Sequence, residues 1–182
     1  AFYYSLIKKQ VKPFCLSESY ARWITQNPKE DFTNITIAQF EKIFANNTND
    51  KKGIMKDNAK YFYYAEQQYN VNGIFLAAVA IHESNWGTSA MAQNKKNLFG
   101  YGAYDRAPSE NAEGIDMLAR VFAKYYLNPK GTAIYNGEVA SGNYYYGSTL
   151  TGVNTKYASD KNWANAVYKW MQYLYNKFLQ EK

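Results

Sequence analysis

The longest apolar run of the chain extends from Ile74 to Ile81 and contains no polar side chain. A helix that is apolar on every side is typical of the centre of a protein core. The run is far shorter than the roughly 20 residues that a membrane-spanning helix needs. We therefore expect a buried central helix and no insertion into a membrane.

Four further segments repeat apolar residues at the spacing of a helix with one buried face. Gly87 is expected to end the central helix, and a Ser or Thr after it to cap a short next helix. Asp160 is placed to cap the last helix. The pattern thus predicts a mainly helical fold, with additional helices over residues 37–45, 57–70, 110–127 and from about 163 onward.

Three stretches lack this periodicity. Residues 94–108 are rich in Gly and Tyr and predict a loop or a small strand. Residues 131–159 have a similar composition and predict an aromatic-walled loop rather than a helix. Residues 1–50 contain two prolines that break helices and predict an N-terminal arm, packed on a catalytic domain over residues 51–182.

The aromatic content adds a hint of the ligand. The 182-residue chain has 19 Tyr, 10 Phe and 4 Trp, and the flat face and polar edge of Tyr and Trp suit stacking on sugar rings. The net charge of +6 favours an anionic partner. The Lys and Arg residues are scattered, however, without the basic stripe of a nucleic-acid-binding protein. We expect a monomer without a nucleic-acid partner.

The candidate for chemistry is Glu83, which follows the apolar run and precedes Trp86. Apolar surroundings and the negative end of a helix dipole favour a protonated carboxyl group. Such a group can donate its proton to a departing glycosidic oxygen. The alternative is an exposed helix end that pairs with a lysine. The chain has one His and one Cys, too few for a zinc site, and we expect no metal and no cofactor.

Three blocks of the sequence carry a more specific signal. The first runs from Ile74 to Ser89, and the third runs from Asn154 to Ala164. The second joins Asn97-Leu98-Phe99-Gly100 to Ala103-Tyr104-Asp105. Together they resemble the glycoside hydrolase family 73 autolysins, which are bacterial endo-β-N-acetylglucosaminidases. The resemblance implies a lysozyme-like helical domain with a small strand-bearing lobe beside the active-site groove.

The resemblance also implies an activity and a set of site residues. The activity is hydrolysis of the β-1,4 bond between N-acetylglucosamine and N-acetylmuramic acid in peptidoglycan, with Glu83 as the catalytic glutamate and Tyr157 assisting. The second carboxylate is left open between Glu113, Glu110 and Asp105, and the acetamido oxygen of the substrate can replace it. Apart from the resemblance, the aromatic side chains that we expect to line the groove, because such rings stack on sugars, are Trp86, Phe99, Tyr101, Tyr104 and Tyr125.

Two alternatives stay open at this point. A muramidase or a lytic transglycosylase would act on the same glycan and release different ends. A non-catalytic wall-binding module would hold the glycan with its aromatic side chains and use Glu83 only structurally. In each case the resemblance implies a secreted, cell-wall-associated protein.

Overall fold

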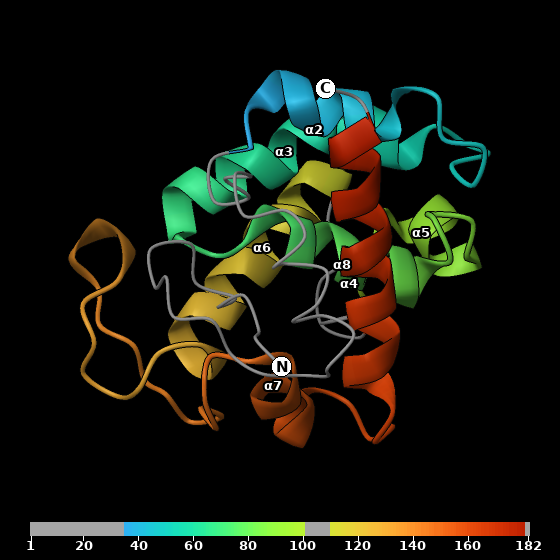
Figure 1. Ribbon diagram of the computed structural model, residues 1–182. Coiled ribbons are helices and arrows are strands. Elements are labelled where there is room, and N and C mark those ends of the chain that lie inside the picture. Colours follow the sequence, from blue (N-terminus) through green and yellow to red (C-terminus); the bar gives the residue numbers. More distant parts are fainter. Residues whose placement is uncertain (1–34, 101–109, 181–182) are drawn as a thin grey trace.

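The computed structural model describes residues 35–100 and 110–180 (Figure 1). Within these ranges strand-type pairing is limited to isolated bridges, such as the antiparallel bridge between Ala133 and Val139. The mainly helical fold is therefore confirmed, whereas the strand-bearing lobe remains a prediction. The α-helices are α2 (Ile37–Ala45), α3 (Ile54–Tyr69), α4 (Gly73–Ser84), α5 (Ala90–Lys95), α6 (Asn111–Val121), α7 (Leu150–Tyr157) and α8 (Trp163–Gln180).

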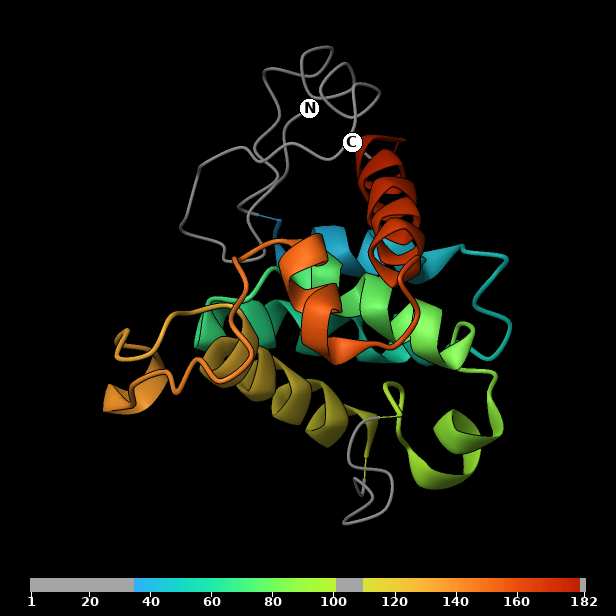
Figure 2. The same cartoon turned by 90° about the horizontal axis from the view of Figure 1, so that it is seen from below.

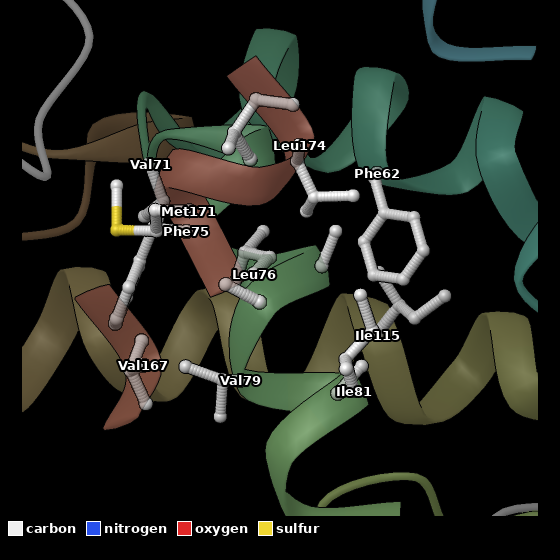
Figure 3. Close-up of a cluster of buried hydrophobic side chains, with 14 of the residues drawn as sticks. Phe62, Val71, Phe75, Leu76, Val79, Ile81, Ile115, Val167, Met171 and Leu174 are labelled. Carbon is white, nitrogen blue, oxygen red and sulfur yellow. The ribbon is translucent and has the colours of Figure 1, made fainter. Parts of the chain in front are cut away.

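Helix α4 is the predicted central helix. All its residues from Gly73 to Ile81 are buried, and it packs against α8 and α3. The side chain of Asn72 begins the helix, because its Oδ1 accepts a hydrogen bond from the N–H of Phe75 (2.9 Å) while its Nδ2 donates to the hydroxyl of Tyr175 in α8 (3.1 Å). Figure 3 shows the resulting core, with labelled side chains Phe62, Phe75, Leu76, Val79, Ile115, Val167, Met171 and Leu174.

Helix α2 confirms the helix predicted over residues 37–45. Thr36 and Gln39 form a capping box at its start, and Asn46 ends it. Its buried face packs on α3 and α8 through Phe40 and Phe44, among others. The rest of the predicted arm, residues 1–34, lies outside the described residues.

Helix α6 continues directly into a π-helical turn, Phe122–Tyr126. The N–H of Leu127 closes this turn on the carbonyl oxygen of Phe122 at 2.9 Å. Turns of this kind are rare and occur frequently at functional sites. The predicted helix over residues 110–127 is confirmed in extent, although its apolar spacing gives no sign of the π geometry.

Helix α7 corrects the prediction of a loop throughout residues 131–159. Its N-cap is Thr149, whose Oγ1 accepts a hydrogen bond from the N–H of Gly152 (3.0 Å). Gly152 lies so close to the preceding loop that a Cβ atom there would be 2.3 Å from the carbonyl oxygen of Gly147. The helix forms despite its Gly and Thr content because it packs against α8, and such tertiary contacts override intrinsic propensity.

The close approach at Gly152 generates a stability prediction. Gly152→Ala would force the loop backbone away from α7 and should lower the free energy of unfolding by about 2 kcal/mol. The matched control is Thr155→Ala, an exposed position of the same helix, which should change it by about 0.5 kcal/mol or less. Urea denaturation followed by circular dichroism measures both. Equal stability of the two variants would contradict the packing described for α7.

Candidate active site

The chain reverses abruptly after Glu83, which lies in the last turn of α4. Asn85, Trp86 and Gly87 all have left-handed backbone conformations, with φ angles of 47°, 59° and 73°. Two of the three are not glycine, so the turn stores backbone strain, a feature that clusters at functional sites. The hydroxyl of Ser84 stabilises the turn by accepting a hydrogen bond from the N–H of Gly87 (2.8 Å). The side chain of Glu83 is thereby left at the open end of the helix.

The carboxylate of Glu83 has a single hydrogen-bond partner among the described residues. The indole N–H of Trp163 donates to its Oε1 at 2.8 Å, and Trp163 is itself buried at the start of α8. Glu83 is exposed, so the expectation of apolar surroundings is wrong. Glu83 lies on the outward side of the last turn of α4, while Ile81 and Ser84 of the same turn are buried. The alternative is confirmed in its exposed helix end, but the pairing with lysine that it included is not found within residues 35–100 and 110–180.

Asn154 holds the loop that joins α7 to α8 and so fixes Trp163. Its Nδ2 donates to the carbonyl oxygens of Asp160 (2.9 Å) and Ala158 (3.4 Å), and its Oδ1 accepts from the N–H of Ala164 (3.1 Å). Asp160, predicted to cap the last helix, accepts from the N–H of Asn162 through its carboxylate (2.8 Å) and from the N–H of Trp163 through its carbonyl oxygen (3.2 Å), and so caps the turn that leads into α8. One side chain thus joins the loop to the first turn of α8.

A pocket of about 390 Å³ opens beside Glu83. It brings together three residues predicted from the sequence: Glu83, Tyr157 and Phe99. The ring of Tyr157 lies between Trp163 and Phe122, with centroid distances of 5.1 Å to each. We call this the Glu83 pocket; its described lining is His82, Glu83, Phe99, Gly100, Tyr157, Ala158, Ser159, Asp160 and Trp163.

Trp86 was expected to line the groove, and this prediction is wrong. Its side chain is only 4 % exposed and meets the rings of Trp170, Tyr173 and Phe44 edge-on, at centroid distances of 5.6, 5.9 and 6.4 Å. The left-handed turn directs the indole into the core between α2 and α8 rather than towards the pocket.

The other predicted site residues are not part of the described lining of the Glu83 pocket. Glu113 is half-buried in the first turn of α6, and Glu110 precedes that helix. Tyr125 contacts Tyr144 (6.3 Å between ring centroids). The remaining three, Tyr101, Tyr104 and Asp105, lie outside the described residues. The second carboxylate therefore remains a prediction.

The apolar pattern marks Trp163 only as a core position of the last helix, so its contact with Glu83 is missed. A signal was nevertheless present. Trp163 lies in the same sequence block as Tyr157, the block on which the family resemblance partly depends. A tryptophan beside a catalytic candidate in such a block is a candidate for positioning it.

A second hollow, of about 480 Å³, lies between α3 and α6 and contains none of the predicted site residues in its described lining. Its carboxylate, Asp116, accepts a hydrogen bond from the hydroxyl of Tyr69 and pairs with Arg120 (3.0 Å). Burial, reinforced by Asp116, raises the pKa of Tyr69 above its ordinary value, and the phenol donates its proton in the hydrogen bond to Asp116. A carboxylate with both oxygens engaged is poorly suited to protonate a sugar, which leaves the Glu83 pocket as the candidate active site.

The described part of the chain offers neither a metal-binding cluster nor a membrane-spanning helix. There, no three His, Cys, Asp or Glu side chains gather as a metal ion would require. The same residues include no helix with the length and apolar character needed to cross a bilayer.

A known protein family matches the part of the chain that forms the site. The glucosaminidase family, described as mannosyl-glycoprotein endo-beta-N-acetylglucosaminidase, matches residues 59–176. The chain belongs to this family, glycoside hydrolase family 73. The matched region contains Glu83, Tyr157 and Trp163, and the resemblance inferred from the three sequence blocks is confirmed.

Individual relatives of this glucosaminidase domain are much longer proteins. A Streptococcus pneumoniae protein that is named as an endo-beta-N-acetylglucosaminidase by assignment is 30% identical over 135 residues. The match covers 74% of this chain and 20% of that protein. The beta-N-acetylglucosaminidase of Bacillus subtilis is 28% identical over 177 residues, which cover 85% of this chain and 19% of that protein. The bifunctional autolysin of Staphylococcus aureus is 27% identical over an alignment of 186 positions, which covers 85% of this chain and 14% of that protein. The chain thus spans a fifth of these relatives or less.

The role of Asn154 can be tested by stability and amide exchange. Asn154→Ala removes three hydrogen bonds and should lower the free energy of unfolding by about 1–3 kcal/mol. Hydrogen–deuterium exchange should show faster exchange at the amide of Ala164, whose acceptor is lost. The Thr155→Ala variant again serves as the control. Unchanged stability and unchanged exchange in Asn154→Ala would show that another contact holds the loop.

Proposed function

We propose that the chain hydrolyses the β-1,4 bond between N-acetylglucosamine and N-acetylmuramic acid in peptidoglycan, with Glu83 as the general acid. The observation that carries this proposal is the exposed carboxylate of Glu83 at a pocket, with one oxygen held by Trp163. Membership of a family of glycoside hydrolases supports it.

The hydrogen bond from Trp163 decides which oxygen carries the proton. An indole N–H is a donor only, so in the protonated acid it bonds the carbonyl-type oxygen, Oε1, and the hydroxyl is formed by Oε2. That oxygen has no hydrogen bond to any described residue. Oε2 then protonates the glycosidic oxygen as the bond between this oxygen and the anomeric carbon breaks. Water supplies the hydroxyl group at the anomeric carbon, and the proton that this water loses restores the acid form of Glu83.

Tyr157, on the wall of the same pocket, orients the acetamido group of N-acetylglucosamine or the attacking water in this proposal. The acetamido oxygen can itself attack the anomeric carbon, a route that needs no second protein carboxylate. Glu113, Glu110 and Asp105 are the protein candidates for the second carboxylate. Asp160 also lines the pocket, but we assign it to the loop, because its Oδ1 bonds the N–H of Asn162.

The substrate would lie along Phe99 and the predicted groove residues Tyr101, Tyr104 and Tyr125. In our proposal the protein is a secreted autolysin that acts at the cell wall. Its net charge of +6 attracts it to anionic wall polymers, and the attraction weakens as salt screens it.

The decisive variant for this proposal is Glu83→Gln. It keeps the shape of the side chain and an acceptor for Trp163 but carries no acidic proton, so turnover should fall by a factor of at least about 100. The measurement is digestion of purified peptidoglycan, borohydride reduction and mass spectrometry. The wild type should release fragments with reduced N-acetylglucosamine ends, and Glu83→Gln should still sediment with the insoluble wall.

Other products would identify other functions. Reduced muramic acid ends would indicate a muramidase, and anhydro-muramic ends a lytic transglycosylase. Binding without released fragments in the wild type would indicate a wall-binding module. Equal release by wild type and Glu83→Gln would remove Glu83 from the chemistry.

A second variant tests the positioning of the acid. Trp163→Phe keeps an aromatic ring against Tyr157 but removes the N–H donor, so kcat should fall by about tenfold with little change in KM. Trp170→Phe is the matched control, since Trp170 lies on the same helix outside the described lining of the pocket, and it should retain the wild-type kcat. Fragment release at several peptidoglycan concentrations separates kcat from KM. Equal kcat values for the two variants would contradict the role of Trp163.

A further inference from the structure

A further pocket, distinct from the hollow between α3 and α6, adjoins the Glu83 pocket across the loop between α7 and α8. It has a volume of about 510 Å³ and is formed by side chains of α7, the loop and the start of α8. Ala158 and Ser159 line both pockets, so a ligand in the first can extend into the second without leaving the surface. We call it the Lys161 pocket; its lining is Thr151, Asn154, Thr155, Ala158, Ser159, Lys161, Ala164 and Asn165.

The two pockets differ in charge. Glu83 and Asp160 line the first, whereas the described lining of the second contains no carboxylate and one cation, Lys161. Lys161 is exposed. The other lysine of this region, Lys156, lies over the ring of Tyr146 (5.8 Å to the centroid) and is not part of the lining. Neighbouring residues of one loop thus present a negative charge to one pocket and a positive charge to the next.

The remaining lining of the Lys161 pocket suits a polar chain rather than an apolar one. It includes the hydroxyl groups of Thr151, Thr155 and Ser159 and the amide of Asn165. Aromatic side chains, which stack on sugar rings, are absent from this described lining and present in the Glu83 pocket. A carboxylate-bearing peptide matches the second pocket better than a further sugar does.

The substrate of the proposed reaction has such a peptide next to the bond that is cut. N-acetylglucosamine is neutral, but the lactyl group of N-acetylmuramic acid carries a peptide stem whose free carboxylates are negative at neutral pH. Muramic acid is the leaving side of the proposed bond. Its stem therefore begins one sugar away from the anomeric carbon that faces Glu83.

We propose that the Lys161 pocket binds the peptide stem of this muramic acid residue, with the ammonium group of Lys161 attracting a stem carboxylate. This inference rests on the proposed function, because it takes the bond and the leaving side from it. The pocket then makes the enzyme select glycan that still carries stems.

The test compares two substrates. One is soluble peptidoglycan strands that carry stems, and the other is the same strands after an amidase has removed the stems and left only the lactyl carboxylate. Lys161→Gln should lower kcat/KM on the stem-bearing strands about threefold to fivefold, as expected for one exposed charge pair. On stripped strands it should match the wild type. Lys169→Gln, an exposed lysine further along α8, should match the wild type on both.

Binding to the Glu83→Gln chain gives a second readout that does not depend on turnover. Its affinity for stem-bearing strands should exceed that for stripped strands and should fall to the stripped value when Lys161→Gln is added. Equal losses on both substrates, or no loss on either, would overturn the stem site. Release of reduced N-acetylglucosamine ends from stripped strands by the wild type would uphold the proposed function in either case.

Discussion

The hydrogen bond between the indole of Trp163 and the carboxylate of Glu83 joins the two helices on which the site is built. Glu83 lies at the end of α4, which is held in position because its residues from Gly73 to Ile81 are all buried. Trp163 begins α8, which packs along α4. In Figure 2 the two helices lie close together near the loop that precedes α8. Because both partners are anchored in the core, a side chain at the surface acquires a defined orientation.

Contacts from α7 and from the π-helical turn hold Trp163 in the position from which it bonds Glu83. Asn154 fixes the loop before Trp163 through hydrogen bonds to Asp160 and Ala164. Tyr157 contacts the ring of Trp163 and that of Phe122 in the π-helical turn, and so connects the two. The site therefore depends on α7 and α6 as well as on the two helices that carry the acid and its donor.

Apolar periodicity was sufficient to predict α2, α3, α4 and α8, because each buries one face or its whole surface. It failed at α7, where Gly152 fits the close approach of a loop that no local pattern records. Trp86 was expected in the groove because aromatic side chains stack on sugars, and a sequence cannot show that three successive left-handed residues turn its side chain inward. Glu83 was singled out by its position after the apolar run and Tyr157 by the family resemblance, and their meeting in one pocket required the fold.

The most direct test of the central claim is the residual activity of the double variant Glu83→Gln, Trp163→Phe, compared with the two single variants. If Trp163 acts only by orienting the acid, the double variant retains the rate of Glu83→Gln alone, because residues that act as one unit are not additive. If the two losses multiply, Trp163 acts independently of Glu83, and the account of a positioned acid is contradicted.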